Sequence, residues 1–250
     1  KPNLKSDGGI WARILPIIRS VLSLLFSLNL DDPNPAIGVA TSDSPEGPFI
    51  NQGKLFDTAE IGVNNSIDPQ FVLDDDGTPY LFWGSWHGIW GVELSEDGLG
   101  YVGEKFQIAG NSFEAPYIIK RDGEFIFFGS KGGCCDGRNS DYRVAVGKAD
   151  SLKGPYYDRN GRDLLLSGGT LILTGSEKFV GPGHNSIITD EAGGDWIVYH
   201  GIDYDHPMIW LGDGITRRPL MIDRVIWEDG WPTIKDGIPS EGVQEGPMTK

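Results

Sequence analysis

The chain has 250 residues, and 36 acidic side chains against 21 basic ones give it a formal net charge of −15. That charge repels phosphate backbones and anionic lipids, so the sequence argues against nucleic-acid and membrane partners. The 39% hydrophobic and 11% aromatic content excludes a long disordered chain, and 36 glycines without a collagen-like period indicate many tight turns.

The first 30 residues are the atypical part of the chain. Pro16 and Arg19 interrupt the apolar stretch from Ile14 to Leu30, and this stretch also lacks a small-residue cleavage site. It is therefore predicted to be neither a membrane span nor a signal peptide, and no signal peptide is visible elsewhere in the chain.

From about residue 35 the pattern is typical of short strands joined by tight turns. Aromatic and β-branched runs follow turns at Asp76-Gly77, Asp122-Gly123 and Gly193-Gly194. Asp-Gly pairs supply the positive backbone angles that two-residue hairpin turns need. The sequence predicts three similar hairpins, with paired strands at 71–73 and 80–82, 117–119 and 125–127, and 186–188 and 196–198.

A second element repeats at longer range. One apolar run leads to Gly47-Pro48, and another leads to Gly154-Pro155, which lies 107 positions further on. That spacing corresponds to two repeats of roughly 50 residues, which suits the four-stranded blades of a β-propeller. The sequence therefore favours an all-β chain of the propeller type with about four blades, over a β-sandwich with several similar hairpins.

The blades are predicted before residue 60 and at about 64–110, 113–175 and 182–234. No linker rich in Ser, Pro or Gly separates them, so residues 1–250 are expected to form a single domain. Residues 235–250 are polar and rich in Gly and Pro, which is typical of a loose tail.

The only two cysteines, Cys134 and Cys135, are adjacent. Neighbouring cysteines rarely pair, because the bond strains the intervening peptide, so no disulfide is expected and the redox compartment cannot be read from them. No nearby base motif indicates a reactive thiol. The pair is predicted to be a loop element beside a cleft.

Three polar side chains stand at the entrance to the first predicted strand of a blade: Asp68, Glu114 and His184. The two carboxylates are 46 residues apart, about one blade. A single Asp or Glu at such a place is usually a turn or capping residue, but equivalent placement in successive blades favours convergence on one cavity. Two carboxylates in one cavity with aromatic neighbours are what cleavage of a glycosidic bond requires.

Several ordered segments resemble family 43 glycoside hydrolases, and together they span about residues 31–234. These segments are Asn65–Ser85, Glu114–Ile118, Gly132–Gly137, Gly168–Thr170, Gly181–Asn185 and Gly230–Thr233. Within that family the Cys-Cys-x-Gly and Gly-Pro-Gly-His segments are most similar to the endo-α-1,5-L-arabinanases.

The resemblance implies a five-bladed propeller that hydrolyses arabinan or arabino-oligosaccharides with inversion. Glu114 matches the general acid, and Asp68 matches the third carboxylate, the pKa modulator that also holds acid and substrate in place. His184 matches the axial histidine associated with calcium or another ion, although calcium prefers oxygen ligands. The resemblance also implies a monomer that is secreted or periplasmic.

Polar and aromatic residues of the matching segments are the candidates for sugar binding. They are Asn65, Ser85, Trp86, His87, Cys134, Asn139 and Asn185. An alternating tryptophan usually belongs to the core of a sheet. Trp83 is therefore expected in the core, with Trp86 or His87 nearer to the cleft.

The chain departs from the family pattern in its general base, an Asp in an Asp-Pro motif of the first blade. Asp7, Asp31 and Asp32 are the only acids near the start, and none has that strand context. The segment from Arg13 to Leu28 also lacks the turn signal expected of a hairpin. The sequence thus predicts a truncated or frame-shifted chain that lacks the first blade and has weak or no arabinan hydrolysis.

Two other functions stay open. One is an exo-acting α-L-arabinofuranosidase or β-xylosidase of the same family, which differs in the shape of the cleft. The other is a non-catalytic carbohydrate-binding propeller, which the unlocated base favours.

Overall fold

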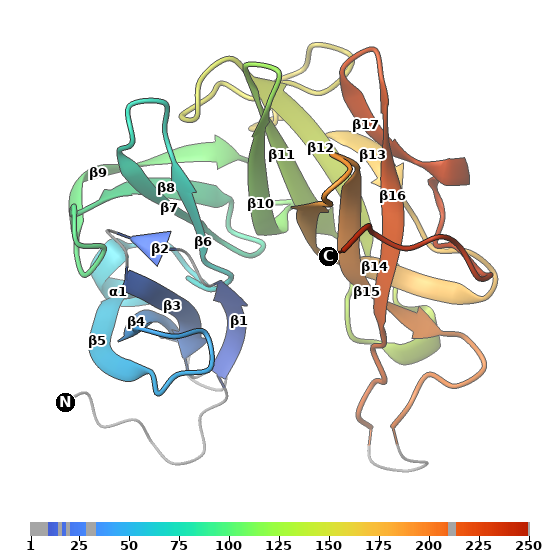
Figure 1. Cartoon of the computed structure of the whole chain (residues 1–250), viewed down its shortest axis with the longest axis horizontal. Coiled ribbons are helices and arrows are strands. Elements are labelled where there is room, and N and C mark those ends of the chain that lie inside the picture. Colours follow the sequence, from blue (N-terminus) through green and yellow to red (C-terminus); the bar gives the residue numbers. More distant parts are fainter. Residues whose placement is uncertain (1–9, 15–16, 19–20, 29–33, 210–213, 250) are drawn as a thin grey trace. The chain divides into compact units, whose positions relative to one another are not determined.

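The computed structural model describes residues 10–14, 17–18, 21–28, 34–209 and 214–249 (Figure 1). These residues form two compact units. Unit 1 holds the described residues up to Ile118 together with 150–155, and unit 2 holds 119–149 and the described residues from Tyr156 onward. None of the helices in the described ranges is both long enough and apolar enough to cross a membrane.

Unit 1 contains two antiparallel sheets, called blade 1 and blade 2. In blade 1 the order is β1-β3-β4-β5, with β2 paired to β3, and in blade 2 it is β6-β7-β8-β9. The helix α1 (Thr58–Ile61) connects them. The strands are β1 (Ile10–Ile14), β2 (Ile17–Ile18), β3 (Val21–Leu28), β4 (Ala36–Ser42), β5 (Ile50–Asp57), β6 (Gln70–Leu73), β7 (Pro79–Trp83), β8 (Ile89–Leu94) and β9 (Tyr101–Ala109).

Blades 3 and 4 are the sheets β10-β11-β12-β13 and β14-β15-β16-β17. Blade 3 lies in unit 2 except for the start of β10, which belongs to unit 1. Two short 3-10 helices, η1 (Gly137–Asn139) and η2 (Lys235–Gly237), flank these strands. The strands are β10 (Glu114–Arg121), β11 (Glu124–Lys131), β12 (Arg143–Ala149), β13 (Thr170–Leu173), β14 (Phe179–Thr189), β15 (Asp195–Asp203), β16 (Leu220–Glu228) and β17 (Trp231–Ile234).

The prediction of an all-β chain of the propeller type with about four blades is confirmed. Each blade follows the chain order of its strands, as the repeated hairpins indicated. Phe71 pairs with Leu81 in blade 2, and Ile187 pairs with Ile197 in blade 4. The predicted turns have the backbone that Asp-Gly chemistry provides, with φ of 84° at Gly77 and 89° at Gly123.

The described residues of segment 13–28 form paired strands, which its sequence did not predict. It has no turn signal, and yet β1 and β3 pair antiparallel, with Ile10 opposite Leu28. Strand β3 also pairs along its length with β4, from Leu22 opposite Ser42 to Leu28 opposite Ala36. Pairing with neighbouring strands and burial in the core therefore stabilise β3, although no local turn signal in its sequence predicts it. Residues 15–16 and 19–20, which join these strands, lie outside the described residues.

The core of unit 1 joins its two blades. Leu25 of β3 is fully buried in one cluster with residues of blade 1 and blade 2. Trp83 is also fully buried, as expected, and its ring lies 4.9 Å from that of Phe56. Its indole Nε1 donates a hydrogen bond to Ser66 Oγ at 3.1 Å, so the buried polar atom is satisfied.

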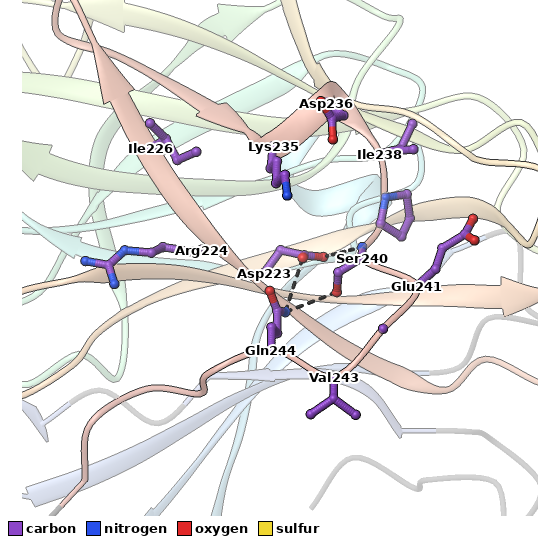
Figure 2. Close-up of a pocket in the computed structure, with 12 residues that line it drawn as sticks. Asp223, Arg224, Ile226, Lys235, Asp236, Ile238, Ser240, Glu241, Val243 and Gln244 are labelled. Atoms are coloured by element: carbon purple, nitrogen blue, oxygen red, sulfur yellow. Dashed lines mark hydrogen bonds between the residues drawn. The ribbon is translucent and has the colours of Figure 1, made fainter.

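Residues after β17 make defined contacts within unit 2. The N–H of Thr174 donates to the carbonyl of Gly237 at 2.8 Å, and the N–H of Met248 donates to Asp190 Oδ2 at 3.3 Å. Figure 2 shows a pocket in this region, where Asp223 accepts hydrogen bonds from Ser240 and Gln244. These contacts hold residues 235–248 against unit 2, where the sequence predicts a loose tail.

Candidate active site

The three residues singled out from the sequence lie at, or next to, positions with unusual backbone angles. Asp68 has φ of 59°, His184 has φ of 50°, and Ala115, next to Glu114, has φ of 51°. Residues other than glycine rarely adopt this left-handed backbone conformation. It costs free energy and persists only where contacts with neighbouring groups hold the backbone in place. Asp68 and Glu114 stand at the starts of β6 and β10, whereas His184 lies inside β14, at an irregularity of its pairing with β15.

Glu114 is buried, with 8% of its surface exposed, and one neighbour fixes its carboxylate. The hydroxyl of Ser85 donates to Glu114 Oε2 at 2.8 Å, and the backbones of the two residues form an antiparallel bridge. Beside them, the N–H of Trp86 donates to the carbonyl of Phe113 at 3.0 Å. The turn after β7 and the start of β10 are thus joined by both backbone and side chain.

Asp68 approaches the same turn from blade 2. It is 7% exposed, and its N–H donates to Ser27 Oγ at 3.0 Å. The carbonyl of Ile67 accepts a hydrogen bond from the N–H of Gly84 at 3.0 Å. The segments that carry Asp68 and Glu114 therefore border one turn within unit 1, as the spacing of the carboxylates indicated.

The turn itself requires glycine and presents an aromatic ring. Gly84 has φ of 138°, and a Cβ there would lie 2.1 Å from the carbonyl oxygen of Gly88. Trp86 and His87 are exposed in this turn, the former by 43%, whereas Trp83, three residues before Trp86, is buried. Asn65 is half-buried, and its Nδ2 donates to the carbonyl of Ser85 at 3.4 Å. An exposed indole in the turn that borders both carboxylate segments offers an apolar face on which a sugar ring can stack.

Unit 2 carries the remaining candidates. His184 is exposed, and its N–H donates to Ser130 Oγ at 2.8 Å. Asn185 is only 4% exposed, and within the described part of the chain neither side-chain atom of its amide has a hydrogen-bond partner. A buried amide without a partner is costly, so this one is available to a polar ligand or to water.

His200 is a residue that sequence reasoning missed. It lies opposite Gly183, and its ring stacks on Tyr142 at 5.6 Å between centroids. Burial, with the positive charge of Arg218 nearby, lowers the pKa of His200 to about 3, so the imidazole is neutral at physiological pH. Its position at the end of the 195–199 run, equivalent to that of Gly84 in the repeated hairpin, is the signal that could have found it.

The structure corrects the prediction for the cysteines, because Cys134 and Cys135 form a disulfide. Their Cα atoms are 3.8 Å apart, as across a trans peptide. Gly133 N–H donates to Asp141 Oδ1 at 2.6 Å and folds the loop locally. From outside the loop, Arg218 Nη1 lies 3.5 Å from Cys135 Sγ. Contacts within the loop and from Arg218 outside it accompany this pairing, which sequence separation alone argued against. Asn139 lies in η1 of the same loop and is exposed.

A calcium ion finds few ligands among these residues. In the described ranges there is no group of three or more His, Cys, Asp and Glu side chains that could hold a metal. Calcium takes six to eight oxygen ligands, and an imidazole is not one of them. Water would have to fill most of the shell of an ion at His184, so calcium stays a prediction and no chemical step is assigned to it. Asp7, Asp31 and Asp32 lie outside the described residues.

Antiparallel blades of four or five strands and two buried carboxylates whose segments border a turn with an exposed tryptophan are features of propeller-type glycoside hydrolases. The model of glycosyl hydrolases family 43 matches residues 3–232, and the chain belongs to this family.

Named relatives and solved structures agree with that membership. The extracellular endo-α-(1→5)-L-arabinanase 1 of Bacillus subtilis is 32% identical over 231 residues, which cover 89% of this chain and 68% of that protein. The extracellular exo-α-(1→5)-L-arabinofuranosidase of Cellvibrio japonicus is 28% identical over 92% of this chain and 71% of its own length.

Among solved structures, an exo-1,5-α-L-arabinanase from a bovine ruminal metagenomic library superimposes with a TM-score of 0.81. It is 30% identical, and the match covers 93% of this chain and 79% of that one. The α-L-arabinanase of Cellvibrio cellulosa, in complex with arabinohexaose, gives a TM-score of 0.80 at 27% identity, over 91% of this chain and 77% of that one. The fold and the family of this chain are therefore those of known arabinan-directed hydrolases.

Proposed function

We propose that this chain acts on α-1,5-linked L-arabinan by hydrolysis with inversion, and that Glu114 is the general acid. The observation that carries the proposal is the pair of buried carboxylates, Asp68 and Glu114, whose segments border the single turn 84–88. The relatives named as endo- and exo-acting arabinan-cleaving enzymes support the choice of substrate.

The geometry of Glu114 suits proton transfer to a leaving group. Its Oε2 accepts the hydrogen bond from Ser85, while its Oε1 has no hydrogen-bond partner among the described residues. Oε1 is thus free to hold the proton that passes to the departing arabinose oxygen. Asp68 has the complementary role of a fixed neighbouring carboxylate, and its backbone is tied to Ser27.

Substrate binding is proposed for side chains that each unit carries by itself. Trp86 and His87 offer exposed rings in unit 1, and Asn185 offers an unpaired amide in unit 2. Asn65, Ser85, Cys134 and Asn139 complete the proposed set. A secreted location follows the relatives named extracellular, and the protein is proposed to act as a monomer.

Glu114→Gln tests the proposal. The amide keeps the size of the side chain and still accepts a bond from Ser85, but it cannot donate the proton. We expect hydrolysis of arabinan to fall by about 10²–10⁴-fold while binding of arabino-oligosaccharides persists. Glu104→Gln, on the exposed face of β9, is the matched control and is expected to change neither.

The products separate the remaining alternatives. A ladder of oligosaccharides indicates endo action, and a single short product released from chain ends indicates exo action. The relatives named as exo-acting support the second possibility. Sugar binding without hydrolysis by the unaltered chain would favour a carbohydrate-binding module and would contradict the enzymatic proposal.

A further inference from the structure

Three buried serines occupy corresponding places in successive blades. Ser27 lies near the end of β3, Ser130 near the end of β11, and Ser85 two residues after β7. Each of these strands is the second in its sheet. Ser27 and Ser130 are fully buried, and Ser85 is 1% exposed. A hydroxyl so placed must find a hydrogen-bond partner inside the protein.

Each serine finds that partner at the first strand of the following blade. Ser27 Oγ accepts the N–H of Asp68 at 3.0 Å, across 41 residues of sequence. Ser130 Oγ accepts the N–H of His184 at 2.8 Å, across 54 residues. Ser85 instead donates its hydroxyl to the carboxylate of Glu114 at 2.8 Å, across 29 residues.

These partners are the three site residues that the sequence singled out. By contrast, the hydroxyl of the buried Ser42 makes a local hydrogen bond, because it donates to the carbonyl of Ser44 at 2.8 Å. Two of the three long-range bonds are accepted from residues with left-handed backbone, Asp68 and His184, and the third reaches the residue before Ala115, which has the same conformation. Such backbone persists only where neighbouring groups hold it.

We propose that Ser27, Ser85 and Ser130 are positioning residues that act as one repeated device. A hydroxyl at the end of the second strand of each blade holds the site residue at the first strand of the next blade. Ser85 has the additional effect of donating directly to the side-chain carboxyl group of Glu114. This inference rests on the proposed function, because its kinetic readout uses Glu114 as the general acid.

Ser85→Ala is the primary test, with arabinan as substrate. The hydroxyl of Ser85 holds the carboxyl group of Glu114 in one orientation, and a general acid must be aimed at the leaving oxygen to act. We expect kcat to fall by about tenfold with KM little changed, because a misplaced acid weakens transition-state stabilisation and leaves substrate binding intact. Ser42→Ala, which deletes a buried hydroxyl with local bonds, is expected to leave kcat unchanged.

The other two serines provide an internal contrast. Ser27→Ala and Ser130→Ala delete an acceptor for a backbone N–H and remove no bond to a carboxylate. Both are expected to lower kcat by several-fold, which is less than the loss in Ser85→Ala. An equal loss in all three variants and in Ser42→Ala would reveal a general loss of structure and would overturn the specific role of Ser85.

A readout without turnover separates this inference from the proposed function. In protein with ¹³C-labelled Glu carboxyls, the resonance that Glu114→Gln removes is expected to change its chemical shift in Ser85→Ala, because the hydrogen bond to this carboxyl group is lost. Ser85→Cys, of similar size but a weak donor, should give a smaller change and guards against misfolding of the alanine variant. Superimposable resonances in all three proteins would overturn the positioning role, whereas absent hydrolysis with a changed resonance would overturn only the proposed function.

Discussion

At the scale of single residues, position within a turn separates two tryptophans that are three residues apart. Trp83 ends β7 and points into the core, whereas Trp86 follows the tight Gly84 turn and is 43% exposed. Sequence alternation predicted the core role of Trp83. It could not choose between Trp86 and His87 for the cleft, because both are exposed and only the backbone of the turn orients them.

Alanine substitutions at the two tryptophans are expected to have opposite effects. Trp86→Ala should weaken binding of arabino-oligosaccharides by about fivefold, because a stacking face is lost, with the unfolding temperature unchanged. Trp83→Ala should lower the free energy of unfolding by about 3–5 kcal/mol, because it leaves a cavity and removes the hydrogen bond from the indole to Ser66. Calorimetric titration and urea unfolding measure the two quantities, and an unaltered affinity in Trp86→Ala would remove this residue from the binding set.

At the scale of elements, strand β3 is the informative case. Its sequence has no turn signal, while its neighbour β4 supplies a complete set of backbone partners. The other hairpins were predicted because Asp-Gly pairs are a local sequence signal for a tight turn. The β3 pairing could not be predicted in this way, since its cause lies in another strand and in the core that the two blades share.

Leu25→Ala tests whether β3 is an integral strand of blade 1. Leu25 is fully buried in the core cluster of unit 1, so we expect the free energy of unfolding to fall by about 2–5 kcal/mol. Leu166→Ala, at a leucine that is 93% exposed, is the control and should change stability by less than about 0.5 kcal/mol. Equal stability of the two variants in urea would contradict the packing of β3.

The β14–β15 turn ties a hairpin to the C-terminal residues through one carboxylate. The indole of Trp196, then the N–H of Gly194, donate to Asp190 and lower the pKa of its carboxyl below 3.8. A lowered pKa in the folded state means that the stabilisation is present above the unfolded value and is lost as pH falls through 3.8 toward the folded value.

Asp190→Asn should therefore lower the unfolding temperature at pH 7 and have a smaller effect at pH 3, because at pH 3 the carboxyl of the unfolded chain is mostly protonated and part of the stabilisation is lost. Differential scanning calorimetry at the two pH values measures this difference. Asp229→Asn, in the exposed turn between β16 and β17, is the matched control. A difference that stays constant between pH 7 and pH 3 would contradict the role of the charge.

At the scale of the whole molecule, the described residues contain the proposed acid but no assigned general base. Inversion requires a base to activate water on the opposite face of the sugar. The match to the B. subtilis relative covers 68% of that protein. The predicted lack of a first-blade general base stays a prediction.

Arabinan hydrolysis by this chain is expected to be weak, by about 10²–10⁴-fold relative to an enzyme with an assigned base. Sodium azide, a nucleophile that needs no base, should then raise turnover and give an arabinosyl azide of inverted configuration. Product NMR measures this outcome. Azide should not rescue Glu114→Gln on arabinan, because the leaving group still lacks its acid. Full activity without azide would contradict the prediction and would indicate that another carboxylate acts as the general base.

The sequence by itself determined the class of this protein. Hairpin turns, the repeat of about 50 residues and the placement of Asp68 and Glu114 are local or periodic signals, and each was readable from neighbouring residues. Only the tertiary structure decided the pairing of β3, the Cys134–Cys135 disulfide and the bond from Ser85 to Glu114. These depend on groups that meet through folding, across tens of residues or within a loop that the rest of unit 2 shapes, and no pattern along the chain records such meetings.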